Sequence, residues 1–191
     1  MPRKPDPTLK PAIIEKVTEH LHDTKLEAVS VRSLGRVLGT SAYPIVYHFG
    51  SREALIDAVV EHLDRDLADL RLVPDAGPAA LRHWLIAVFG GLEHRDRFLA
   101  ARLTFELGAV ETLDGRERER LVHHGHLAAV AEWCRAHGYA TPDAEQAASE
   151  AVCAARGAQW AALVDPDGTD VDGALRAIAD RLASGAQVPV A

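Results

Sequence analysis

Residues 30–55 read SVRSLGRVLGTSAYPIVYHFGSREAL, and this stretch decides the fold of the first part of the chain. Ser30 is suited to cap a helix whose apolar residues recur every three or four positions. Gly39 can end that helix, and Ser41 can cap a short further helix that carries Ile45. Two helices joined by so short a turn are typical of a helix-turn-helix.

Helical periodicity continues through the rest of the chain. Apolar residues at spacings of three and four predict further helices, and no run of residues alternates as a half-buried strand does. We therefore expect an all-α fold of about nine helices. The expected helices cover residues 11–21, 30–38, 41–49, 51–70, 81–92, 98–105, 116–137, 141–162 and 175–182.

The segment PDAGP at residues 74–78 is the clearest interruption of this helical pattern. It predicts a domain boundary, so that a helix-turn-helix domain over 1–52 is followed by a connecting helix over 53–73. A second helical domain is then expected over 74–191.

The composition indicates a soluble globular protein of 191 residues, 48% hydrophobic, with a net charge of −7. The sequence has no stretch of about 18 apolar residues that would span a membrane. Its first residues lack the apolar core of a signal peptide, and two cysteines are too few for a disulfide framework. We therefore expect a cytoplasmic protein that has no membrane partner.

Charge is unevenly distributed along the chain. Residues 1–52 hold eight basic and five acidic side chains, a net charge of +3, so the remaining residues carry −10. A polyanion would therefore bind the first part of the chain.

Two segments, LGTS at 38–41 and YHFGSREAL at 47–55, resemble the pattern of the tetracycline-repressor (TetR) family of bacterial transcription regulators. The resemblance implies that 1–52 binds DNA and that 74–191 binds a ligand and forms a homodimer. It also implies a repressor that a small molecule, whose identity the sequence does not indicate, releases from a palindromic operator. The pattern has a tyrosine where this chain has Val46, so one phosphate-directed hydroxyl is missing.

The candidate DNA contacts fall into two groups. Residues at the start of a recognition helix face base edges in the major groove, and four residues have this position: Thr40, Ser41, Ala42 and Tyr43. The resemblance implies that Arg32 approaches a base and that four residues contact phosphate: Ser30, Tyr47, His48 and Arg52. Arg3 and Lys4 lie on a proline-rich arm that can also reach DNA, although a solvated tail is the favoured interpretation.

Other interpretations of these residues stay open. Tyr47 can cover the small helical core, His48 can be an ordinary helix-end residue, and Arg32 can be a solvated charge. The net charge and Val46 also leave open a helix-turn-helix that has lost DNA binding and serves as a protein-interaction module.

The second domain has candidates for a ligand pocket, because apolar walls with a few polar groups are typical of small-molecule sites. These candidates are Trp84, Phe98, Arg102, Phe105, His123, His126 and Trp133. Arg102 can pair with an acidic ligand or with Glu106, and the aromatic residues can simply fill the core. His123 and His126 can face one way on a helix, so a histidine-based metal site is an alternative, although no further ligand is identifiable.

An alanine-rich stripe and the final helix are the candidate dimer interface. Small side chains allow a second helix to approach closely, and the resemblance implies that the last two helices pair with those of a second copy. The expected interface residues are Ala147, Ala151, Ala154, Ala155, Ala158, Ala162, Leu175, Ile178 and Leu182. Ordinary packing within one chain is the alternative.

Enzymatic motifs are missing from the sequence: it has no glycine-rich phosphate loop, no GxSxG elbow and no HExxH. Cys134 and Cys153 lie within expected helices among apolar residues, where a thiol is usually inert. We therefore predict no catalytic residues, no bound metal and no cofactor.

Overall fold

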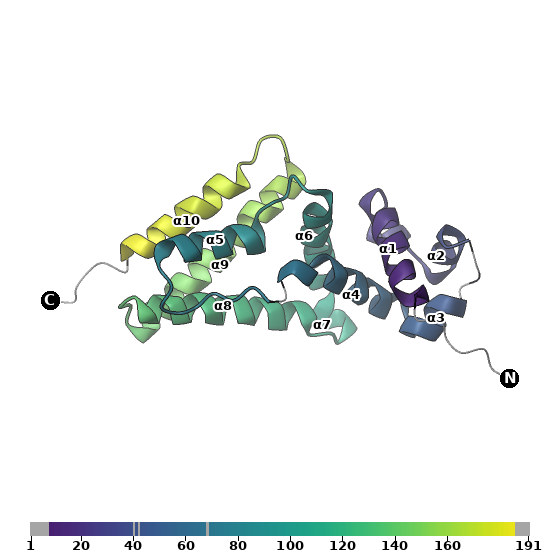
Figure 1. The fold of residues 1–191 in the computed structure, drawn as a ribbon, viewed down its shortest axis with the longest axis horizontal. Coiled ribbons are helices and arrows are strands. Elements are labelled where there is room, and N and C mark those ends of the chain that lie inside the picture. Colours follow the sequence, from purple (N-terminus) through teal and green to yellow (C-terminus); the bar gives the residue numbers. More distant parts are fainter. Residues whose placement is uncertain (1–7, 40, 42, 68, 186–191) are drawn as a thin grey trace. The chain divides into compact units, whose positions relative to one another are not determined.

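The computed structural model describes residues 8–39, 41, 43–67 and 69–185, so Arg3, Lys4, Thr40 and Ala42 lie outside the described residues. Within those ranges the chain is entirely helical, which confirms the all-α prediction (Figure 1). The elements are α1 (Leu9–His22), η1 (Leu26–Ala28), α2 (Val31–Val37), α3 (Tyr43–Phe49), α4 (Arg52–Leu63), η2 (Arg65–Leu67), α5 (Pro78–Phe89), α6 (Arg95–Gly108), α7 (Glu111–Asp114), α8 (Arg118–Ala136), α9 (Thr141–Val164) and α10 (Val171–Gly185).

Two compact units make up the chain, Met1–Arg65 and Asp66–Ala191. This division differs from the predicted boundaries because α4 is not a separate connecting helix. Its buried residues Leu55, Ile56 and Val59 belong to the first unit, where α4 packs against α1 and α3. The helix also ends at Leu63, before the apolar stripe that continues to residue 70 in the sequence.

In the first unit, local hydrogen bonds set the start of each helix that the sequence marked with a serine. The Ser33 N–H donates to Ser30 Oγ at 3.0 Å and the Ser30 N–H donates to Ser33 Oγ at 2.8 Å, which makes a capping box at α2. Ser51 Oγ accepts from the Ala54 N–H at 3.1 Å at the start of α4. Both predicted caps are confirmed.

The turn between α2 and α3 begins at Gly39, whose φ of +67° lies in the left-handed region that glycine adopts without strain. α3 begins at Tyr43, two residues after Ser41, and Ser41 Oγ accepts from the Tyr43 N–H at 3.4 Å. Pro44 is therefore the second residue of α3, where its missing N–H costs no intrahelical hydrogen bond.

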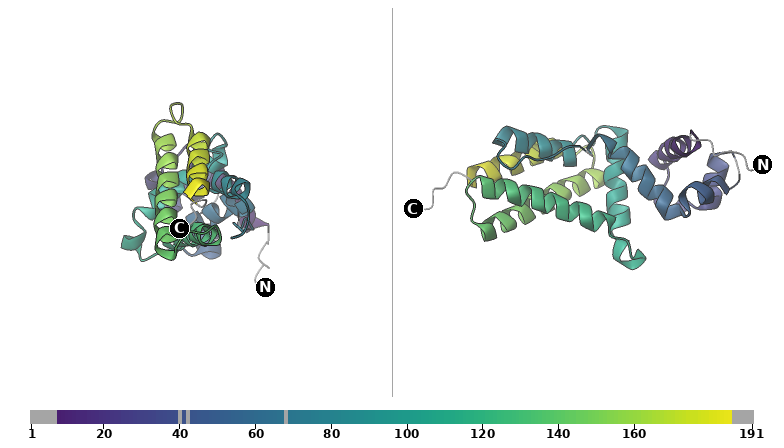
Figure 2. Two further views of the ribbon diagram at one scale, coloured as in Figure 1. Left: turned by 90° about the vertical axis from the view of Figure 1, so that its left-hand side faces the viewer. Right: turned by 60° about the horizontal axis from the view of Figure 1, so that its bottom comes forward.

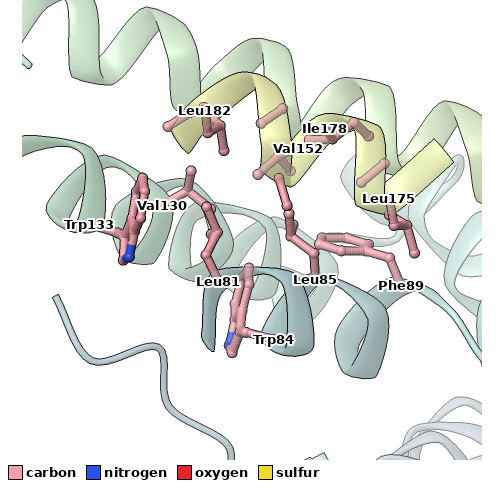
Figure 3. Packing of buried hydrophobic residues seen from close by; sticks show 14 of the residues in the cluster. Leu81, Trp84, Leu85, Phe89, Val130, Trp133, Val152, Leu175, Ile178 and Leu182 are labelled. Carbon is pink, nitrogen blue, oxygen red and sulfur yellow. The ribbon is translucent and has the colours of Figure 1, made fainter. Parts of the chain in front are cut away.

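The second unit has one hydrophobic core, to which α5, α8, α9 and α10 contribute. α10 packs against both α5 and α9, and the two final helices run side by side (Figure 2). Leu81, Trp84, Leu85 and Phe89 of α5 point toward residues of α9 and α10, while Val130 and Trp133 of α8 close the core (Figure 3).

Two details of the second unit differ from the sequence prediction. α7 was not expected, because one turn of helix is too short to show periodicity. Thr141 is the first residue of α9 rather than its cap, a position that Ala140 occupies with no side-chain hydrogen bond. Among the described residues, no helix has the length and apolar character that crossing a membrane requires.

Candidate functional site

One face of α3 carries three large exposed side chains. Ile45 on the opposite face is fully buried, whereas Tyr43 is 69% exposed, Val46 52% and Tyr47 56%. The rings of Tyr43 and Tyr47 stack with centroids 5.8 Å apart and an interplanar angle of 25°. The helix is thus anchored by one side and presents aromatic and methyl groups on the other.

Three further predicted DNA contacts lie near the start of α2 and the end of α3. Ser30 is exposed, but its hydroxyl already takes part in the α2 capping box. Arg32 is exposed on the first turn of α2. His48 is half-buried, with edge-to-face contacts to Tyr47 at 5.0 Å and to Phe49 at 6.5 Å between centroids.

Arg52, a predicted phosphate contact, also makes hydrogen bonds within the first unit. Its Nε donates to the Val29 carbonyl and its Nη2 to the Leu26 carbonyl, both at 2.6 Å, while its Nη1 lies 3.3 Å from Glu53 Oε1. All three guanidinium nitrogens are therefore engaged within the unit. Arg52 ties the segment that precedes α2 to α4, and its contact with phosphate stays a prediction.

Two residues of the predicted ligand pocket, Trp133 and Arg102, have partners within the chain. Trp133 is fully buried, its Nε1 donates to the Ala76 carbonyl at 2.7 Å, and its ring stacks on His137 at 3.8 Å. Arg102 Nε lies 3.3 Å from Glu106 Oε1, the intrachain partner that the sequence left open. Trp133 thus has a core role, and Arg102 has an acidic partner of its own.

A different cluster gathers around His126. Its ring lies 5.7 Å from Trp84 and 5.2 Å from Phe89 between centroids, at angles of 80° and 70°. The guanidinium carbon of Arg156 lies 5.1 Å from the centre of the Phe89 ring, and Arg156 Nη1 donates to Gln159 Oε1 at 2.8 Å. We call His126, Trp84, Phe89, Arg156 and Gln159 the His126 cluster.

Arg156 is the main positive charge of the His126 cluster, and it acts on the pKa of Glu119 as well as on those of the two histidines. Burial lowers the pKa of His126 to about 4, and the positive charges of Arg156 and His123 act in the same direction. Burial and Arg156 also lower the pKa of His123. His126 Nδ1 is buried and makes no hydrogen bond to any residue that the structure describes.

Phe89, Arg156 and Gln159 were missing from the predicted site, although the sequence contained a signal for two of them. Arg156 is the one basic residue in the alanine-rich stretch 141–164, and Gln159 lies three positions away on its buried face. A charged residue and an amide within such a stretch indicate a polar environment inside the fold.

Glu111 and Glu119 form a second polar cluster at the start of α8. Glu111 Oε1 accepts from the Glu119 N–H and Oε2 from the Arg120 N–H, both at 2.8 Å. Burial opposes ionisation of Glu111, but these two donors outweigh it and lower its pKa. Burial raises the pKa of Glu119, which pairs with Arg118. Glu111 therefore pairs with two N–H groups at the start of α8 that have no acceptor within the helix.

Most residues of the predicted dimer interface belong instead to the core of this chain. The buried ones are Ala151, Ala155, Ala162, Leu175, Ile178 and Leu182. Ala147 and Ala158 are half-buried against the same core, and Ala154 is exposed. The alternative, packing within one chain, therefore applies to the alanine stripe, because its small side chains allow α9 to approach the neighbouring helices closely.

The opposite face of α9 is exposed and largely apolar. We call this the outer α9 face, and it consists of Cys153, Ala154, Gly157, Trp160 and Val164. Trp160 is 55% exposed. A groove of about 250 Å³ borders this face at Ala154 and lies between α9 and α10, with Ile178 and Tyr139 among its lining residues.

The structure gives no support to a histidine-based metal site. Among the described residues, no group of three or more His, Cys, Asp or Glu side chains is placed to hold a metal ion. Cys134 is buried, which raises the pKa of its thiol to about 11, and Cys153 is exposed.

Comparison with known proteins shows which solved structures have a similar fold. No protein-family model and no curated protein matches the sequence. A transcriptional regulator from Rhodococcus sp. Rha1 is similar in structure with a TM-score of 0.75, 18% identity, and coverage of 94% of this chain and 99% of that one. A TetR transcription regulator from Haloarcula marismortui has a TM-score of 0.67 and 16% identity over 93% and 97% of the two chains.

BioQ bound to its double-stranded DNA operator is a further similar structure, with a TM-score of 0.54, 20% identity, and coverage of 92% of this chain and 98% of that one. These similarities extend over both units, and they agree with the observed order of helices. The chain therefore has the fold of the TetR-family transcriptional regulators.

Proposed function

We propose that this protein is a DNA-binding transcriptional regulator, a homodimeric repressor that binds a two-fold symmetric operator and is released by a small molecule. The observation that carries the proposal is the exposed face of α3, with Tyr43, Val46 and Tyr47 on a helix whose other side is anchored by Ile45. A helix so placed in a helix-turn-helix is of a size to enter the major groove. The likeness to BioQ in complex with its operator supports the same function.

The proposed contacts follow from exposure and chemistry. Tyr43 and Arg32 face base edges, together with Ser41. Thr40 and Ala42, which lie outside the described residues, stay predicted base contacts. The Tyr47 hydroxyl, His48 and Ser30 contact phosphate, which positions the helix without reading sequence. The net charge of +3 over residues 1–52 assists approach to DNA.

Selection from random double-stranded DNA tests the proposal. We expect an enriched palindrome, because a dimer with two-fold symmetry binds a DNA site with the same symmetry. Its half-sites should be separated by a whole number of helical turns of about 10–10.5 base pairs. Affinity falls steeply as salt rises, because phosphate contacts release counterions. A folded protein that enriches no sequence would contradict the proposal and favour a protein-interaction module.

We place the homodimer interface on the outer α9 face, which shares only the exposed Ala154 with the predicted alanine stripe. Trp160 and Val164 are large exposed apolar side chains, and Gly157 lies between them and Cys153 on the same face. A second copy that covered this face would bury the apolar residues, and Gly157 would allow close approach of the two backbones. The bordering groove between α9 and α10 gives the partner a concave surface to fill.

We place the effector in the His126 cluster. Trp84 and Phe89 provide apolar walls, and Arg156 and the unbonded His126 Nδ1 provide polar partners. This combination fits a small aromatic or acyl compound that carries a carboxylate, since a guanidinium binds carboxylate with charge-assisted hydrogen bonds. Release from DNA requires that this ligand bind the DNA-incompetent state more tightly.

A thermal-shift experiment tests this site with benzoate, indole-3-acetate and octanoate on the wild type, Arg156→Gln and Arg102→Gln. We expect an acid that raises the melting temperature of the wild type and of Arg102→Gln, but not of Arg156→Gln. The same acid should weaken operator binding by the wild type. Equal stabilisation of all three proteins would place the ligand elsewhere.

A further inference from the structure

The exposed face of α3 has an unusual chemistry for a helix that reads base pairs. Its residues Tyr43–Phe49 include no Arg, Lys, Asn or Gln, the side chains that make bidentate hydrogen bonds to guanine and adenine. The exposed face offers instead two phenols and the two methyl groups of Val46. This helix is therefore poorly suited to read purines by paired hydrogen bonds.

Val46 is exposed on that face. Residues 43, 46 and 47 have the spacing that places side chains on one side of a helix, and the stacked rings of Tyr43 and Tyr47 are held 5.8 Å apart beside it. Val46 is 52% exposed although α3 buries Ile45, its sequence neighbour. A β-branched side chain has little freedom in a helix, so its methyl groups have a defined direction.

The major groove contains one apolar group that such a side chain can meet. Thymine carries a C5-methyl at the groove edge, whereas none of the other three bases carries a methyl group there. Contact between this methyl and the Val46 methyl groups removes apolar surface of both partners from water, which no other base pair allows.

We propose that Val46 determines specificity by contacting the C5-methyl of a thymine in each half-site. The inference rests on the proposed DNA-binding function and assigns to Val46 a role in base recognition. The Tyr43–Tyr47 stack positions the helix face around it, and the operator contains a thymine at an equivalent position in each half-site.

Replacement of thymine by 2′-deoxyuridine in the selected operator tests this assignment, because it removes the methyl group and leaves base pairing unchanged. We expect one thymine position per half-site at which the replacement weakens wild-type binding about three- to fivefold, the effect of one buried methyl group. Both half-sites replaced together should give about tenfold or more. As a control, a cytosine of the operator is replaced by 5-methylcytosine, which adds a methyl group without changing base pairing.

The variant Val46→Ala separates Val46 from other sources of methyl recognition, Ala42 among them. Because Val46 is exposed, this change should leave the melting temperature unchanged, and we expect Val46→Ala to bind the thymine and deoxyuridine operators equally at that position. Val46→Thr, which keeps one methyl group, should retain part of the discrimination.

The outcomes separate the two proposals. If the wild type binds the thymine and deoxyuridine operators equally, the assignment of Val46 is overturned but the proposed function is not. The same holds if Val46→Ala loses as much affinity as the wild type when thymine is replaced by deoxyuridine. A protein that binds no DNA overturns the proposed function and this assignment with it.

Discussion

Replacement of Trp160 by alanine should dissociate the proposed dimer while leaving the fold intact. Trp160 is 55% exposed, and a tryptophan side chain presents about 250 Å² in total, so a partner can cover about 140 Å² on each protomer. At about 25 cal/mol per Å², this gives about 3 kcal/mol per side chain as an upper limit. Symmetry doubles the number of side chains affected.

Only part of this burial free energy contributes to the free energy of dimerisation, because ordering the interface opposes association. We therefore expect Trp160→Ala to weaken dimerisation by about 3 kcal/mol or more per dimer, which is a factor of about 100 in Kd. Sedimentation over a range of protein concentrations measures this change directly. Leu121→Ala is the matched control, because Leu121 is also an exposed large apolar residue but lies on α8.

A second pair of variants tests the same face without removing a large side chain. A Cβ added at Gly157 or at Gly125 meets no heavy atom within 4 Å in the described part of the chain, so glutamate is accommodated at both. Gly157→Glu places two like charges in the proposed interface and should give a monomer, whereas Gly125→Glu on α8 should remain dimeric. Intact dimers for both Trp160→Ala and Gly157→Glu would refute the interface.

Three further predictions concern stability. Arg52→Ala and Arg52→Lys should both lower the free energy of unfolding of the first unit by about 2–3 kcal/mol in urea denaturation, because neither replaces the two bonds to the Leu26 and Val29 carbonyls. Glu111→Gln should cost about 1–2 kcal/mol at pH 7. Because folding lowers the pKa of Glu111, this loss should be complete above the ordinary value of 4.5 and disappear as pH falls through the folded value in acid denaturation curves. Ala151→Glu should reduce the melting temperature rather than dissociate a dimer, since Ala151 is buried in its own chain.

The first unit was predictable from sequence because short-range interactions specify it. The Ser30 and Ser51 caps depend on donors three residues away, and Gly39 depends on its own φ. The exposure of Tyr43 was expected from its place at the start of the helix, whereas the sequence left open whether Tyr47 covers the core. These signals are complete within a few residues, so no knowledge of distant packing was needed.

The roles of Arg52 and Arg156 could not be predicted in the same way. The carbonyl acceptors of Arg52 lie 23 and 26 residues before it in the chain. Arg156 of α9 meets Phe89 of α5, which is distant in sequence. A guanidinium can reach several partners from one position in the sequence. Which partner it contacts depends on the segments that fold beside it.

By itself, the sequence determined the helical class, the helix-turn-helix and the exposure of Tyr43 at the start of α3, because periodicity and capping are local properties. Only the tertiary structure decided which face of α9 is buried. The alanine stripe and the outer α9 face share the same helical period, and both consist largely of small or apolar residues. Periodicity shows that a helix has an apolar face, but the partner of that face depends on the packing of α5, α8 and α10 around it.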